Sequence, residues 1–168
     1  AVRASPMRVL EKISRILNQM FLLIAGAFMA AMILITCANI FLRIVWVPVK
    51  GTFELMGFFG AVATAFVLGY TQLKKAHISV DILVNRFSQR IRTVLDGINY
   101  FVCMIFFAVL GWQISRLAAT IWKTGEVTET LRIVYYPFSY GVALGCFLLA
   151  LVLLVDFLKL FFNKTEAP

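Results

Sequence analysis

The sequence predicts an all-α membrane protein with four transmembrane helices, both termini in the cytoplasm, and amphipathic helices on the membrane surface. Three observations support this fold class. The chain of 168 residues is 62% hydrophobic and only 14% charged, whereas a soluble domain is about half apolar and a quarter charged. The apolar residues form four runs, each long enough to cross the hydrocarbon, which takes about 20 residues. The basic residues gather between alternate runs, as they do in membrane proteins.

The net charge does not indicate a nucleic-acid partner. The formal charge is +8 at pH 7, but the basic residues stand in short clusters between the apolar runs. Phosphate binding requires a basic face on a folded soluble domain. We therefore expect a lipid bilayer around this chain and no nucleic acid bound to it.

The first apolar run predicts a transmembrane helix over residues 19–44. The run is too long for the core of a signal peptide, which has about 7–15 residues. Residues 7–18 before it place apolar and basic side chains on opposite helical faces. Such a helix suits an anionic membrane surface, and a simple cytoplasmic extension of the first span explains the pattern equally well.

The second run predicts a span over residues 53–73, and one face of it carries small residues at every fourth position. These residues form a stripe of Gly57, Ala61, Ala65 and Gly69. Small residues let helix backbones approach closely, so the stripe indicates helix packing. The packing partner is either another helix of this chain or a helix of a partner subunit.

The connection after the second span contains the only histidine of the chain. Residues 78–92 have one apolar face, which predicts an interfacial helix or a cytoplasmic elbow. His77 and Asp81 are four positions apart and share a helix face. A metal site needs at least one further ligand, so we expect this pair to shape the turn into the surface helix.

Two further spans are predicted over residues 94–121 and 138–162. The third span contains Arg116 close to its end, where we expect it to reach the headgroups or to pair with a carboxylate of the following loop. The fourth span contains Gly141 and Gly145 in a GxxxG pattern, which is typical of close packing between membrane helices.

The distribution of basic residues predicts the orientation of the four spans. Those assigned to one side, in the termini and the middle connection, are Arg3, Arg8, Lys12, Arg15, Lys74, Lys75, Arg86, Arg90, Arg92, Lys159 and Lys164. Those on the other side are Arg43, Lys50, Lys123 and Arg132, with Arg116 nearby. The more basic side faces the cytoplasm in membrane proteins, so both termini and the middle connection are expected there.

The sequence offers few residues for chemistry. One histidine cannot supply both ligands of a bis-histidine haem, and the three cysteines stand singly inside apolar runs without a CxxC pair. No Gly-rich phosphate loop, HExxH motif or Ser-His-Asp set appears. We therefore expect no catalytic residue, no cofactor and no metal, and a membrane protein that is rich in packing surfaces.

Several segments between residues 39 and 83 form a characteristic set. They are residues 39–43 (Asn-Ile-Phe-Leu-Arg), residues 51–55 (Gly-Thr-Phe-Glu-Leu), Gly69, and residues 77–81 (His-Ile-Ser-Val-Asp). With this set, the chain resembles the small membrane subunit of tripartite ATP-independent periplasmic (TRAP) transporters. The resemblance covers nearly the full chain and is most specific between Arg43 and Leu83.

This resemblance implies a secondary transport system in the bacterial inner membrane. A periplasmic binding protein would deliver an organic anion, and a large membrane subunit would move it in an elevator-like manner, usually coupled to sodium. The resemblance implies that the small subunit extends the fixed scaffold of that elevator and does not bind the substrate.

One contact and two alternatives follow from the same residues. Arg43 and Glu54 flank the turn between the first two spans, so we expect them to form an ion pair that sets its geometry.

A self-sufficient small exporter also has four spans, but it carries a membrane-embedded carboxylate in the first span, where this chain has none. A four-helix redox or enzyme membrane subunit is the second alternative, and bound haem or quinone would support it.

Overall fold

The computed structural model describes residues 4–74 and 89–163, and these residues form four long helices. They are α1 (Ala4–Val45), α2 (Thr52–Leu73), α4 (Gln89–Thr124) and α5 (Tyr136–Asn163). All four are long and apolar enough to cross a membrane. The predicted all-α class and the four predicted spans are confirmed at this level.

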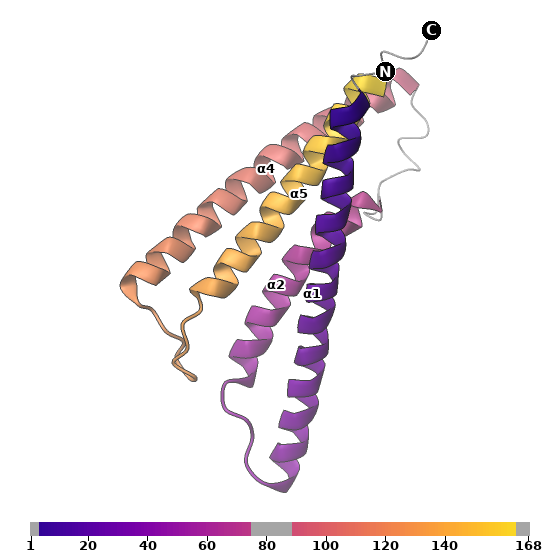
Figure 1. The fold of residues 1–168 in the computed structure, drawn as a ribbon. Helices are drawn as coiled ribbons and strands as arrows, with labels where there is room; N and C mark the ends of the chain where they lie inside the picture. Colours follow the sequence, from indigo (N-terminus) through magenta and orange to yellow (C-terminus); the bar gives the residue numbers. More distant parts are fainter. Residues whose placement is uncertain (1–3, 75–88, 164–168) are drawn as a thin grey trace.

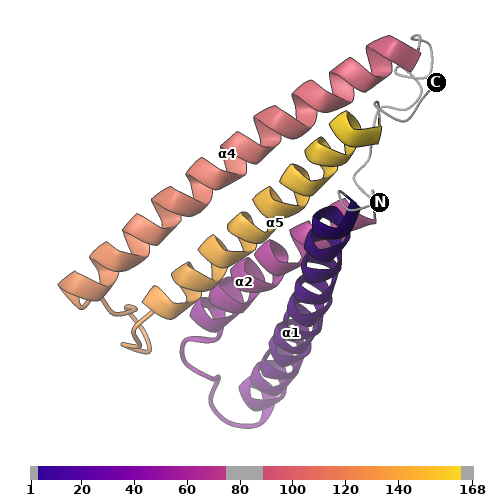
Figure 2. The same ribbon diagram turned by 45° about the horizontal axis from the view of Figure 1, so that its top comes forward.

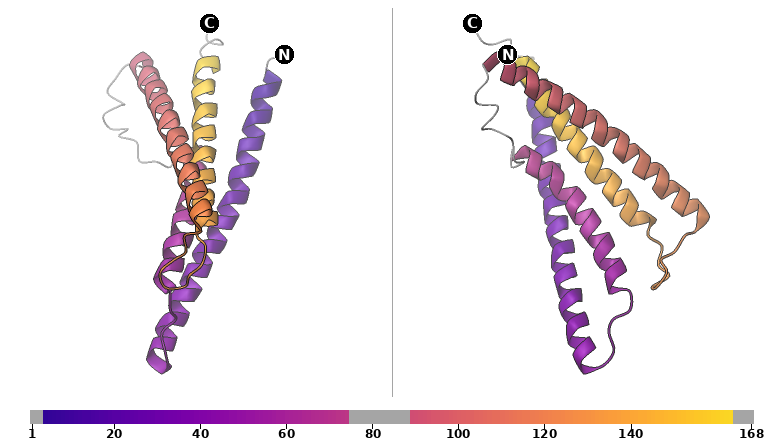
Figure 3. Two further views of the ribbon diagram at one scale, coloured as in Figure 1. Left: turned by 90° about the vertical axis from the view of Figure 1, so that its left-hand side faces the viewer. Right: turned by 180° about the vertical axis from the view of Figure 1, so that it is seen from behind.

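The helices form an open fan (Figure 1). In this view the hairpins α1–α2 and α4–α5 overlap at the end where α1 begins and α5 ends, here called the narrow end. They spread apart toward the opposite end, the wide end, which carries the α1–α2 and α4–α5 connections. The view from behind shows the same divergence, whereas the view from the side shows α4, α5 and α1 separated at the narrow end and converging toward the wide end, so the helices cross one another (Figure 3).

The helices stand in the order α4, α5, α2, α1 across the fan (Figure 2). Extensive contacts join α4 to α5, α5 to α2, and α2 to α1, with a smaller contact between α1 and α5. In the most apolar stretch of each helix, 50% of the residues are buried in α5, but only 11% in α4 and 6% in α1. The two inner helices therefore form the core, and the two outer helices present long apolar faces.

The core residues of α5 explain its central position. Its buried residues are small or branched apolar ones, and Val152 is fully buried. Between α1 and α2 a second cluster contains Ala25, Val62, Ala63 and Phe66. In a bilayer, helix association depends on close van der Waals contact, so small residues at these positions bring the helices together.

Local sequence signals account for the helix ends. Pro48 and Gly51 lie in the connection after α1, and Pro137 occupies the first turn of α5, where a missing N–H costs nothing. Gly125 follows α4 with φ +67°, and its N–H donates to the carbonyl of Ile121 at 3.0 Å. A left-handed glycine directly after the last turn is a common helix C-terminus.

The predicted N-terminal surface helix is not a separate element. Residues 7–18 continue into the first span without a break inside α1. This agrees with the alternative interpretation, in which the segment extends the first membrane helix. The second predicted surface segment, residues 78–92, lies mostly outside the described residues, and its end belongs to α4.

Candidate functional site at the wide end

Glu54 connects the two hairpins at the wide end. It lies in the first turn of α2, and its two carboxylate oxygens accept hydrogen bonds from the backbone N–H groups of Thr130 at 2.8 Å and Leu131 at 3.2 Å. Hydrogen bonds to an ionised acceptor are stronger than neutral ones. The contact fastens the α4–α5 connection (residues 125–135) to the start of α2, and we call this arrangement the loop lock.

Gly51 forms the second part of the loop lock. Its φ is +75°, a conformation that residues with a side chain rarely adopt. A Cβ atom at this position would overlap the side chain of Leu131. The hydroxyl of Thr52, the next residue, donates to the carbonyl of Val49 at 2.9 Å. Glycine is therefore required both by the backbone turn and by the close approach of Leu131.

Asn39, near the end of α1, bonds to the α1–α2 connection. Its side-chain oxygen accepts a hydrogen bond from the backbone N–H of Val49 at 2.9 Å. An Asn in the last two turns of a span would otherwise present an unpaired amide to the bilayer. The bond therefore ties the α1–α2 connection to the end of α1, just before α2 begins.

The α4–α5 connection has a defined internal structure. The backbone N–H of Thr128 donates to the carbonyl of Ile133 at 3.0 Å, and the N–H of Ile133 donates to the Thr128 hydroxyl at 3.3 Å. Arg132, between them, has φ +52°. These bonds form a small hairpin whose turn presents the N–H groups of residues 130 and 131 to Glu54.

Tyr135, at the end of the α4–α5 connection, bonds back to Glu126 near its start. Its hydroxyl donates to a carboxylate oxygen of Glu126 at 2.8 Å. The bond to Glu126 raises the pKa of the Tyr135 hydroxyl, because loss of the proton would remove the donor and place two negative charges together. The contact therefore holds at neutral pH and is lost only in strong base, as pH rises through the folded-state pKa.

Aromatic rings fill the space between α2 and the start of α5. Phe58 stacks on Tyr135 with ring centroids 5.7 Å apart and on Phe138 at 5.1 Å. Phe138 also contacts Phe59. Such pairs contribute about 0.5–1.5 kcal/mol each beyond their burial. Phe58 lies one turn along α2 from Glu54, so the rings pack beside the loop lock.

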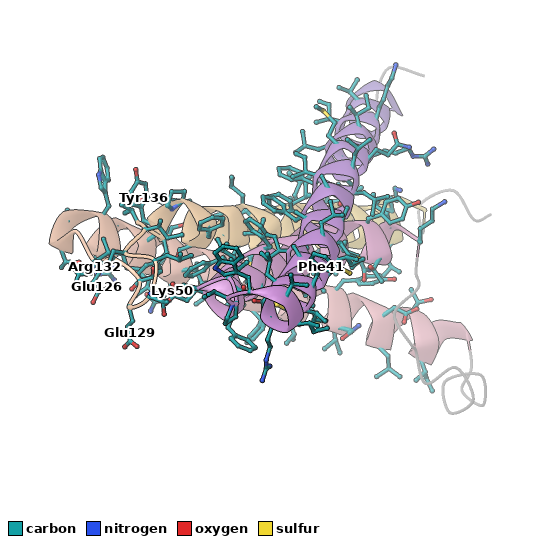
Figure 4. All side chains as sticks on the ribbon, turned by 90° about the horizontal axis from the view of Figure 1, so that it is seen from below. Phe41, Lys50, Glu126, Glu129, Arg132 and Tyr136 are labelled. Atoms are coloured by element: carbon teal, nitrogen blue, oxygen red, sulfur yellow. The ribbon has the colours of Figure 1, made fainter. Side chains whose placement is uncertain are left out.

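Charged side chains surround the two connections. The view from the wide end shows Lys50 beside the α4–α5 connection, with Glu129 pointing away from the helices (Figure 4). The wide end therefore presents charges of both signs around the loop lock.

The expected ion pair between Arg43 and Glu54 is wrong. Both residues are described, and the structure records no ion pair between them. The carboxylate of Glu54 is instead occupied by Thr130 and Leu131. Sequence reasoning paired the two charges that flank the turn, whereas two backbone N–H groups aimed at one carboxylate are available only after the distant connection folds.

The predicted small-residue stripe on α2 divides into two halves. Ala65 and Gly69, toward the narrow end, are buried. Gly57 and Ala61, toward the wide end, are exposed, and a Cβ atom at Gly57 would meet nothing within 4 Å. One half therefore packs inside this chain, and the other half faces outward where the fan opens.

The predicted GxxxG motif packs on α2. A Cβ atom built on Gly145 would lie 2.6 Å from the backbone oxygen of Ala65, and one on Gly141 would lie 3.3 Å from Val62. The motif and the buried half of the stripe thus face each other. Together they set how closely α5 crosses α2.

Polar contacts at the narrow end were missed by sequence reasoning. The amide of Gln72 donates to a carboxylate oxygen of Asp156 at 3.2 Å and joins α2 to α5. Asn18 is fully buried, its amide donates to the carbonyl of Ser14 at 2.8 Å, and its side-chain oxygen faces Gly69. For Asn18, the available signal was that Ser14 and Asn18 are polar and four positions apart on one face of α1.

The predicted pair His77 and Asp81 lies outside the described residues. Within residues 4–74 and 89–163, no group of three His, Cys, Asp or Glu side chains is placed to hold a metal ion.

The family model for tripartite ATP-independent periplasmic transporters, DctQ component, matches residues 32–163. The chain belongs to this family. DctQ proteins are components of transporters and not enzymes. No curated protein and no solved structure matches the chain. The resemblance identified from the sequence is confirmed, and this DctQ protein is a multi-pass membrane protein with four candidate spans.

Part of that resemblance lies at the wide end. Residues 39–43 and 51–55 were two of the segments that carried it. In this DctQ chain they supply Asn39, Gly51 and Glu54, which all act at the wide end. The matched region also includes the α4–α5 connection that Glu54 binds. The exporter and redox alternatives find no support in the family match.

Proposed function

We propose that this chain is the scaffold subunit of a sodium-coupled secondary transporter for organic anions in the bacterial inner membrane. It supports a large elevator-type membrane subunit, which receives the substrate from a periplasmic binding protein. The chain itself does not bind the substrate. Its membership in the DctQ family supports the choice of transport system.

The observation that carries the scaffold role is the loop lock. An elevator transporter requires a frame that keeps its shape while the transport unit moves against it. Glu54 joins two hairpins that otherwise separate at the wide end, and Gln72 with Asp156 joins α2 to α5 near the narrow end. The two hairpins are therefore joined at two places along α2, which suits a part that stays fixed.

The outer helices suit a subunit that extends another membrane protein. Few residues of α1 and α4 are buried within this chain, and many of their apolar side chains are exposed. An open row of helices offers more lateral surface than a closed four-helix bundle of the same size (Figure 2). That surface is available both to lipid and to the large subunit.

Reconstitution into liposomes tests this function. The large subunit, this chain, or both are inserted, and uptake of a labelled organic anion is measured with its loaded binding protein outside and a sodium gradient. We expect uptake only when both membrane subunits are present, and no substrate binding to this chain alone. Uptake by this chain alone, or full uptake by the large subunit alone, would overturn the proposal.

Labelling in intact cells tests the proposed orientation. After Cys37, Cys103 and Cys146 are replaced by serine, a single cysteine is introduced by Glu129→Cys. A membrane-impermeant maleimide is expected to label it from the periplasmic side of spheroplasts. A cysteine at Lys164 is expected to react only after the membrane is opened. The reverse pattern would place the wide end in the cytoplasm.

A further inference from the structure

Arg116 lies on the face of α4 that points away from the rest of the chain. Gly111 faces α5, because a Cβ atom there would meet Ala143, Cys146 and Phe147. Ala118, seven residues later on the same face, is fully buried. At 100° per residue, Arg116 lies about 160° from Ala118 around the helix, and its side chain is exposed.

The exposed face of α4 changes character along its length. The half toward the narrow end is mainly apolar, with Asn99 as its exposed polar residue, as expected for contact with lipid tails. Its exposed residues include Val94, Ile98, Val102, Ile105 and Val109. The half toward the wide end is polar and aromatic. We call this half the Arg116 face, and it consists of Trp112, Gln113, Arg116, Thr120 and Lys123, all exposed.

Arg116 is poorly placed to reach the lipid headgroups. Trp122 stacks on Tyr136 with ring centroids 6.0 Å apart, and such aromatic residues mark the membrane interface. Arg116 is six residues deeper, which is about 9 Å along the helix. Helical side chains lean toward the N-terminus of their helix, and the N-terminus of α4 is at the opposite, narrow end (Figure 1). The Arg116 side chain is therefore directed into the membrane.

Arg116 also lacks a carboxylate partner among the described residues. The structure records no ion pair for it, and the nearby carboxylate of Glu126 accepts the Tyr135 hydroxyl instead. A cation at this depth faces a cavity or pairs with another group in membrane proteins. Because Arg116 points outward from the fan, that group must come from another molecule.

We propose that the Arg116 face is the docking surface for a transmembrane helix of the large subunit, which presents an Asp or Glu carboxylate to Arg116. This inference rests on the proposed function. Charge complementarity selects the acidic partner, and Arg pairs with carboxylates through two parallel hydrogen bonds. Trp112, 63% exposed one turn away, supplies a large ring, and Trp and Arg are the residues most enriched at the centres of interfaces.

Co-purification in mild detergent tests the proposal. Both membrane subunits are expressed together, this chain is captured by a tag, and the bound large subunit is quantified. We expect Arg116→Leu to reduce it at least about tenfold, because removing one partner leaves the other charge buried and unpaired. Arg116→Lys retains the charge and should lose less. The control Val102→Leu, on the apolar half of the same helix, should retain normal binding.

Crosslinking gives a readout that leaves Arg116 intact. A photoreactive phenylalanine replaces Trp112, and the same residue placed at Phe41 on α1 serves as the control. We expect the Trp112 position to crosslink to a segment of the large subunit that contains a carboxylate. Arg116→Glu should abolish co-purification, and exchange of that carboxylate for Arg in the partner should restore it.

The outcomes separate this proposal from the proposed function. If the large subunit fails to co-purify with the wild-type chain, the proposed function itself fails. If it co-purifies equally with Arg116→Leu, and the Trp112 position crosslinks only to lipid or to a second copy of this chain, the proposed function stands and the Arg116 face is not the docking surface.

Discussion

Glu54 and Leu131 are 77 residues apart in the sequence, yet the carboxylate of Glu54 accepts a hydrogen bond of 3.2 Å from the backbone N–H of Leu131. This bond and its neighbour to Thr130 join the two hairpins at the wide end of the fan. The lock is the only described hydrogen-bonded link between the α4–α5 connection and α2. It therefore provides the most direct test of how the two hairpins are held.

Replacing Glu54 with leucine should release the α4–α5 connection. The two backbone N–H groups would lose their acceptor, and the connection would separate from α2. We expect limited proteolysis of the detergent-solubilised protein to cut residues 125–135 several times faster than in the wild type. Glu129→Gln removes an exposed carboxylate from the same connection and should leave the cleavage rate unchanged. Equal rates for Glu54→Leu and the wild type would contradict the lock.

Gly51 and Gly125 form a matched pair for substitution by alanine. Both have positive φ, at +75° and +67°, so alanine should cost each about 1–2 kcal/mol of unfolding free energy. At Gly51 the added methyl group also meets Leu131, whereas at Gly125 it meets nothing within 4 Å. Denaturation in mixed micelles should show a larger loss for Gly51→Ala. A larger loss for Gly125→Ala would argue against the contact with Leu131.

Gly145→Ala should weaken the contact between α2 and α5. The methyl group would lie 2.6 Å from the backbone oxygen of Ala65, and backbone cannot move aside as a flexible side chain can. Overpacking of this kind costs about 1–3 kcal/mol. Gly57→Ala, at the exposed end of the small-residue stripe, should change the free energy of unfolding by less than about 0.5 kcal/mol. Thermal unfolding in detergent measures both variants, and equal effects would place the α2–α5 contact elsewhere.

Asn18 and Gly69 should be energetically coupled. A methyl group at position 69 would overlap the side-chain oxygen of Asn18, and that oxygen is buried without a hydrogen-bond partner. Gly69→Ala alone should therefore destabilise the protein, and the same substitution in an Asn18→Ala background should cost less. We expect an interaction free energy of about 1 kcal/mol in a double-mutant cycle. Additive effects would show that Asn18 moves freely away from Gly69.

The sequence correctly predicted the features that depend on neighbouring residues. The four spans follow from hydropathy because the thickness of the bilayer sets the length of an apolar helix. Gly141 and Gly145 were identified as packing residues because small side chains four apart leave a groove on any helix. Glu54 was placed correctly at the start of α2, but its partner was not, because the turn that binds it folds far along the chain.

The sequence by itself determined that this chain is a four-span membrane protein of the DctQ type, because hydropathy and local motifs depend only on residues that are close together in the sequence. The tertiary structure decided how those spans are used. It joined Glu54 to Leu131, buried one half of the α2 stripe and exposed the other, and turned Arg116 outward on α4. Each of these depends on how helices cross and rotate, and that geometry arises only when distant segments pack together.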